Sequence, residues 1–132
     1  MSDTTFCSFS HPTQEPAFFQ LHAVFDGHGG SSVSEFAKQH IPHNLKDILR
    51  ANLDATALFA LARQTHGCEE VAAGIETCVA QAVVETNAQL QSEDRQQKLY
   101  QWMGSTAVLC LMWEQHVWIA NAGKLSHRHT HE

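Results

Sequence analysis

The sequence predicts an α+β fold, because strand-like and helix-like segments follow one another in blocks rather than alternating. The aromatic and apolar run 17–25 has the length and composition of a buried strand. Two stretches, 33–49 and 71–90, repeat apolar residues at intervals of three and four, as amphipathic helices do. Two further apolar runs, within 104–123, flank a short polar turn and favour an antiparallel hairpin.

Length and charge are those of one globular domain that binds neither nucleic acid nor membrane. The chain has 132 residues, only 8 lysines and arginines, and a formal net charge of -6. Phosphate backbones and anionic lipids attract clustered cations, and no such cluster is present. No apolar run reaches the ~18 residues needed to cross a bilayer, and the N-terminus lacks a signal-peptide pattern. We therefore expect an intracellular protein, cytoplasmic or nuclear.

The N-terminal third contains a lead-in, a strand and a helix. Residues 1–16 are polar and contain two prolines, which predicts a flexible lead-in. After the strand, Ser31 or Ser32 is placed to cap the first helix. Pro42 lies inside this helix and predicts a kink or a division there.

The remaining segments complete the α+β order. A second helical segment is expected at about 53–63, closed by Gly67, and a long amphipathic helix from Cys68 to about Leu90. A polar linker then leads to the hairpin, and residues 124–132 are expected to fray as a polar tail. The four cysteines are widely spaced without a C-x-x-C pair, which predicts reduced structural thiols: Cys7, Cys68, Cys78 and Cys110.

One short motif carries most of the chemistry, the stretch "AVFDGHGGSS" at residues 23–32. A strand that ends in Asp26, Gly27 and His28 presents a carboxylate, a backbone carbonyl and an imidazole in succession. The carboxylate and the carbonyl are oxygen ligands suited to magnesium or manganese, and His28 is able to move a proton. The residue types alone also fit an ordinary Asp-Gly turn.

Two stretches resemble a known family. "FQLHAVFDGHGG" is similar to the signature of the metal-dependent serine/threonine protein phosphatases of type 2C, the PPM family. "GSTAVLCLMWEQHVWIANAG", residues 104–123, resembles the hairpin that follows later in that family. The resemblance covers residues 17–123 and corresponds to the N-terminal part of a family domain. It implies a partial β-sandwich of two antiparallel sheets with flanking helices, incomplete at the C-terminus, with the present elements contributing to both sheets.

The resemblance implies roles for individual residues. Asp26 matches the carboxylate that bridges two magnesium or manganese ions, and Gly27 the glycine whose carbonyl binds one of them. His28 matches the histidine that protonates the departing seryl or threonyl oxygen. The implied reaction is hydrolysis of phosphoserine or phosphothreonine in phosphoprotein substrates by a metal-bound water. Supporting roles fall to Gly29, Gly30, Gly104, Ser105, Thr106, Asn121 and Gly123.

The sequence also departs from the family pattern. No arginine precedes Arg50, so no residue matches the phosphate-binding arginine that lies upstream of the family's metal motif. After Gly123 the chain continues with Lys124 and Leu125 instead of the family's Asp-Ser-Arg, and the later aspartates are not present. We therefore expect a truncated phosphatase that is inactive as this chain alone.

Two other functions remain as hypotheses. The first is a catalytically dead phosphatase-like module that binds phosphoproteins or a phosphatase partner. The second is a small zinc- or nickel-binding protein, since "HRHTHE" places His127, His129 and His131 at alternate positions; no acid or cysteine partner is fixed nearby, which favours a simple polar tail.

Overall fold

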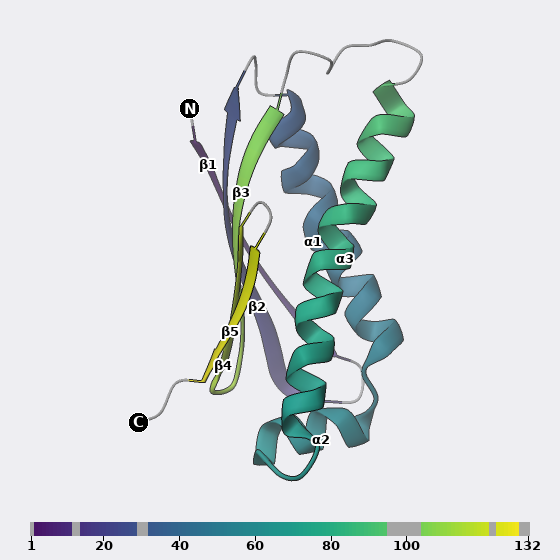
Figure 1. Cartoon of the computed structure of the whole chain (residues 1–132), viewed down its shortest axis with the longest axis vertical. Helices are drawn as coiled ribbons and strands as arrows, with labels where there is room; N and C mark the ends of the chain where they lie inside the picture. Colours follow the sequence, from purple (N-terminus) through teal and green to yellow (C-terminus); the bar gives the residue numbers. More distant parts are fainter. Residues whose placement is uncertain (1, 12–13, 29–31, 95–103, 122–123, 130–132) are drawn as a thin grey trace.

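Five antiparallel strands form one sheet, and three helices pack against one of its faces (Figure 1). The computed structural model describes residues 2–11, 14–28, 32–94, 104–121 and 124–129, with the side chains of 19–25, 33–93 and 107–121. The elements are β1 (Ser2–His11), β2 (Gln14–His28), α1 (Ser32–Asn52), α2 (Ala55–Arg63), α3 (Cys68–Asp94), β3 (Gly104–Trp113), β4 (His116–Asn121) and β5 (Lys124–His129). The α+β fold class is confirmed.

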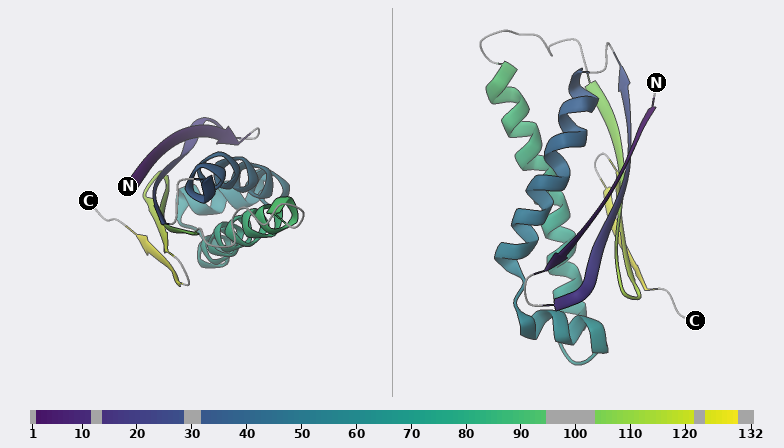
Figure 2. Two further views of the ribbon diagram at one scale, coloured as in Figure 1. Left: turned by 90° about the horizontal axis from the view of Figure 1, so that it is seen from above. Right: turned by 180° about the vertical axis from the view of Figure 1, so that it is seen from behind.

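All five strands belong to a single sheet with the order β1-β2-β3-β4-β5. The expectation that these elements contribute to both sheets of a sandwich is therefore wrong. Each strand pairs antiparallel with the next strand in the sequence, and the three helices form the connection between β2 and β3. Figure 2 shows the resulting two layers from above and from behind, with the helices on one side of the sheet.

Both edge strands occupy segments in which the sequence predicts no regular structure. Residues 2–11, expected as a flexible lead-in, form β1 and pair with β2. Residues 124–129, expected to fray, form β5 and pair with β4. An edge strand needs no continuous apolar run, because backbone hydrogen bonds to one neighbouring strand hold it in place. A polar segment can therefore form an edge strand that its composition does not predict. The β1–β2 register shifts at Ser10/His11, next to the segment that contains Pro16.

The helices match their predicted positions, with one difference. Pro42 does not end or divide α1, which is a single helix from Ser32 to Asn52. Asp54 caps α2, because its carboxylate accepts a hydrogen bond from the backbone N–H of Ala57 at 2.8 Å. Gly67 has a φ of 93° in the connection to α3, a left-handed conformation that glycine adopts without strain.

The core lies between the helices and the inner face of the sheet. Strand residues Phe19, Leu21, Phe25 and Leu111 are fully buried there with helix residues that include Leu45. The predicted apolar faces at 33–49 and 71–90 form the helical side of this core: Val33, Phe36, Ile41, Leu45, Leu49, Ile75, Cys78, Val79 and Ala82 are buried.

Buried polar groups tie the helices to each other and to β4. The indole N–H of Trp118 donates to the carbonyl of Ala72 on α3 at 3.0 Å, and Nε2 of His116 lies 2.9 Å from the carbonyl of Leu61 on α2. Between α1 and α3, the amide of Asn44 donates to Thr86 Oγ1 at 2.9 Å and to Gln89 Oε1 at 3.0 Å. These bonds fix the helical layer on the sheet, since a buried donor without an acceptor is costly.

The other face of the sheet carries no helix in the described part of the chain. Along β2, Phe19, Leu21, Ala23 and Phe25 are buried, whereas the alternate residues Gln20, His22 and Val24 are exposed. The strand period of two separates these faces. Within the described residues, no helix is long and apolar enough to cross a membrane.

Candidate active site at one end of the sheet

The two sequence motifs meet in the register of β2 and β3. Asp26 pairs with Thr106, Gly27 with Ser105, and His28 with Gly104. The C-terminal end of β2 and the N-terminal end of β3 therefore lie side by side at one end of the sheet (Figure 1). The motifs are far apart in the sequence, and antiparallel pairing brings them together.

Buried neighbours anchor this end of the sheet. Phe25 directly precedes Asp26 and is fully buried, and Ala107 directly follows Thr106 and packs against the core. In the strand alternation, position 26 has the parity of Val24, which belongs to the face without helices. Helix α1 begins at Ser32, only four positions after His28.

The edge strand β1 adds residues that the sequence analysis does not assign to the site. Ser2 pairs with Asp26, and Asp3 pairs with Phe25. Asp3 thus brings a second acidic position to the same end of the sheet. The sequence would have assigned Asp3 to the site only if residues 2–11 had been recognised as a strand in this register. The polar composition of this segment does not indicate a strand.

The structure describes only some of the other residues that the sequence analysis singled out. Asn121 is the last residue of β4, where it is exposed and pairs with Val108 and Lys124. It therefore lies two register positions along β3 from Thr106. Gly29, Gly30 and Gly123 lie outside the described residues. His127 and His129 fall in β5 opposite Trp118 and His116, and His131 lies outside the described residues.

The donor chemistry of the motif fits a hard divalent ion, but the number of donors is small. Asp26 and the carbonyl of Gly27 are oxygen ligands of the type that magnesium and manganese bind. Among the residues whose side chains are described, no group of three or more His, Cys, Asp or Glu is arranged to hold a metal ion. The side chains of Asp26 and His28 are not in that set, so the metal site stays a prediction from the sequence.

The three cysteines whose side chains are described have raised pKa values. Cys68, Cys78 and Cys110 are free thiols, which confirms the expectation of reduced cysteines at these positions. Burial raises the pKa of all three, and for Cys68 the neighbouring Glu69 and Glu70 raise the pKa further. Protonated thiols are poor nucleophiles and poor metal ligands. Cys110, expected as a buried residue, is half-buried on the face without helices.

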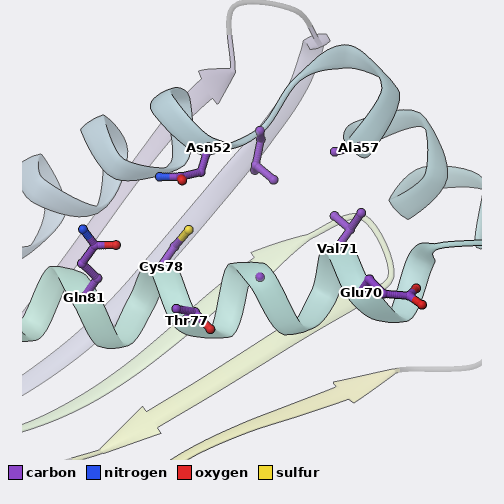
Figure 3. Close-up of a pocket in the computed structure, with 9 residues that line it drawn as sticks. Asn52, Ala57, Glu70, Val71, Thr77, Cys78 and Gln81 are labelled. Carbon is purple, nitrogen blue, oxygen red and sulfur yellow. The ribbon is translucent and has the colours of Figure 1, made fainter.

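A separate cavity of about 420 Å³ lies between the C-terminal end of α1, α2 and α3. Figure 3 shows Cys78, Gln81 and Asn52 around it, with Val71 and Ala57 towards its other end. The phosphatase-like motif precedes the opposite end of α1, a helix of 21 residues and hence ~30 Å long. This cavity is therefore not part of the candidate active site.

Comparisons with known proteins identify the family and the fold of the chain. The family model described as Protein phosphatase 2C matches residues 1–124. The crystal structure of serine-threonine phosphatase 2C from Toxoplasma gondii is similar, with a TM-score of 0.59 and 13% sequence identity. The alignment covers 100% of this chain and 54% of that chain, so the present chain spans about half the length of that structure. No curated protein matches the sequence.

Proposed function

Because the chain belongs to the protein phosphatase 2C family, we propose that it is part of a metal-dependent phosphatase acting on phosphoserine and phosphothreonine in proteins. The observation that carries the proposal is the register that sets Asp26, Gly27 and His28 beside Gly104, Ser105 and Thr106. Backbone pairing at a sheet end with a buried anchor on each strand gives these residues a fixed relative position. In this proposal the substrates are phosphoproteins, and magnesium or manganese is the cofactor.

Each motif residue has a distinct task in the proposed reaction. Asp26 and the carbonyl of Gly27 hold the divalent ions through oxygen. The chemistry that those ions supply when bound is activation of water for in-line attack on phosphorus. His28 donates a proton to the departing seryl or threonyl oxygen, a role suited to an imidazole near neutral pH. Gly104, Ser105 and Thr106 support the motif through strand pairing.

The chain alone is proposed to be without turnover. One carboxylate and one carbonyl supply fewer oxygen ligands than the six that magnesium prefers, so a metal bound by these two groups is held weakly. No arginine is present before Arg50 to bind the substrate phosphate in the way that family members do. The proposal therefore assigns to this chain one corner of the active site and not the complete site.

The test is a manganese titration followed by calorimetry, with hydrolysis of a phosphothreonine peptide measured in parallel. The wild-type chain should show weak binding and no hydrolysis, and Asp26→Asn should abolish the binding. Asp47→Asn is the matched control, because Asp47 is an exposed acid on α1 that contacts His43. Equal binding by wild type and Asp26→Asn would remove Asp26 from the metal site. Hydrolysis that depends on Asp26 would contradict the proposed inactivity.

The second candidate function is a phosphatase-like module that binds phosphoproteins without turnover. It is favoured by the sequence after Gly123, where Lys124 and Leu125 stand in place of the family's Asp-Ser-Arg. In this case the chain should bind a phosphothreonine peptide in the presence of a chelator, and Asp26→Asn should leave the affinity unchanged. Peptide binding that requires manganese and Asp26 would instead support the first proposal.

A further inference from the structure

The cavity between the C-terminal end of α1, α2 and α3 is a candidate binding site that the phosphatase motif does not explain (Figure 3). Its volume of about 420 Å³ lies within the ~300–1,000 Å³ that is typical of small-molecule pockets. Leu53, Ala57 and Val71 supply apolar lining. The sulfur of the buried Cys78 is directed from α3 towards α1. These groups can hold the apolar body of a ligand.

A glycine in the interior of α3 keeps one wall of this cavity open. Gly74 lines the cavity, and a Cβ added at this position would meet nothing within 4 Å. Close packing therefore does not require a glycine there. Glycine also weakens a helix relative to alanine. Gly74 thus enlarges the space beside α3, although an alanine would fit and would favour the helix.

The polar groups of the lining offer mainly hydrogen-bond acceptors. The amide nitrogen of Asn52 already donates to a backbone carbonyl of α1 at 2.7 Å, which leaves the amide oxygen as an acceptor. The hydroxyl of Thr77 donates to a backbone carbonyl of α3 at 3.2 Å, so its oxygen is also left to accept. Gln81 offers both a donor and an acceptor, and Glu70 offers a carboxylate. A matching ligand therefore carries hydrogen-bond donors.

Charge narrows the class of ligand further. Among the described residues that line the cavity, Glu70 is the only one with a formal charge at neutral pH. The chain as a whole has a formal net charge of -6. An anionic ligand would face the Glu70 carboxylate and would find no cationic side chain in the described lining. An ammonium group both donates hydrogen bonds and carries the opposite charge.

We propose that this cavity binds a small organic cation, a protonated amine joined to an apolar body. The ammonium group donates to the Glu70 carboxylate, and the apolar body lies against Leu53, Val71 and the wall that Gly74 leaves open. The cavity is separate from the motif at Asp26, so this inference does not depend on the proposed phosphatase activity.

The test is an NMR titration of the full chain with three ligands that share one apolar body: 4-phenylbutylamine, 4-phenylbutanol and 4-phenylbutyrate. The amine should bind with a Kd on the order of 1 mM and should shift the amide signals of Gly74 and Thr77. The alcohol should bind about fivefold more weakly, because it lacks the charge that pairs with Glu70. The carboxylate should bind about tenfold or more weakly than the amine.

Two variants with matched controls locate the site. Glu70→Gln should weaken binding of the amine about fivefold and leave binding of the alcohol unchanged. Glu69→Gln is its control, because Glu69 is an exposed acid in the same helical turn but does not line the cavity. Gly74→Leu should fill the cavity and abolish binding of both ligands. Ala73→Leu is its control, because Ala73 is an exposed neighbour outside the lining, and it should leave binding unchanged.

A second readout needs no variant and therefore covers the case in which Gly74→Leu fails to fold. Excess 4-phenylbutylamine should slow alkylation of Cys78 in the wild type several-fold and leave alkylation of Cys110 unchanged, because only Cys78 lines the cavity. The proposal would be overturned if the amine does not bind or if the carboxylate binds as tightly as the amine. Equal effects of Glu70→Gln and Glu69→Gln, or alkylation of Cys78 that the amine does not slow, would also overturn it.

Discussion

The two faces of the sheet are built from the same strands, but they differ in what covers them. On the inner face, Leu111 and Trp118 are buried under helices, and the Trp118 indole donates a hydrogen bond to α3. On the face without helices, Val108 and Val24 remain almost half exposed. Alternation of residues along each strand separates the side chains onto two faces of the sheet. The described helices pack against only one of these faces.

The largest contrast is expected from truncating one residue on each face of β3. Leu111→Ala should lower the free energy of unfolding by about 3 kcal/mol, because it leaves a cavity in the core. Val108→Ala should lower it by only ~0.5 kcal/mol. Chemical denaturation provides the measurement. Similar costs for both variants would contradict the difference in burial between the two faces.

Two tryptophans on the inner face allow a finer comparison. The Trp118 indole donates to the Ala72 carbonyl, whereas the buried indole N–H of Trp113 has no hydrogen-bond partner among the described residues. Replacement by phenylalanine removes the same atoms at both positions. Trp118→Phe should therefore cost about 1 kcal/mol more than Trp113→Phe in thermal or denaturant unfolding. Equal costs would mean that the bond to α3 does not stabilise the helical layer.

Substitutions of two threonines on α3 test the contact between α1 and α3. Thr86 is buried, donates to the Ala82 carbonyl and accepts from Asn44, whereas Thr77 is exposed and donates only to the Ala73 carbonyl among the bonds described. Thr86→Val should lower the free energy of unfolding by about 1 kcal/mol, because the Asn44 amide loses an acceptor. Thr77→Val should have an effect of at most a few tenths. A reversed order would contradict the role of Asn44.

The smallest effect concerns the thiols on the two sides of the sheet. Burial raises the pKa of both Cys78, in the core, and Cys110, on the face without helices. An alkylating reagent should modify the half-buried Cys110 faster than the buried Cys78, and both rates should keep rising above the ordinary thiol pKa of ~8.5. Peptide mass spectrometry at pH 7 to 10 measures both rates. Faster modification of Cys78 would show that the core opens locally.

The raised pKa of Cys78 also makes the free energy of unfolding depend on pH. Because the folded pKa of Cys78 lies above that of the unfolded chain, the unfolded thiol ionises first as the pH rises. The stabilisation by Cys78 is complete below the unfolded pKa and is lost as the pH rises through the folded pKa. Cys78→Ala should therefore flatten the decrease in the unfolding free energy between pH 8 and 10.

Local patterns in the sequence predicted the helices, the hairpin at Glu114-Gln115 and the strand that leads to Asp26. Each of these follows from residues close together in the chain, through apolar spacing or a resemblance that covers a short motif. The hairpin turn contains Glu114 with a φ of 55°, and flanking apolar runs were sufficient to locate it. The same local patterns identified Asp26, Gly27 and His28 as candidate site residues.

Tertiary structure decided what no local pattern contains. The strands β1 and β5 exist because neighbouring backbones pair with them, which their polar sequences do not reveal. The register of β2 with β3 brought Asp26 opposite Thr106, and β1 brought Asp3 to the same end of the sheet. The helices all covered one face and left the other open, because packing depends on contacts between residues far apart in the sequence.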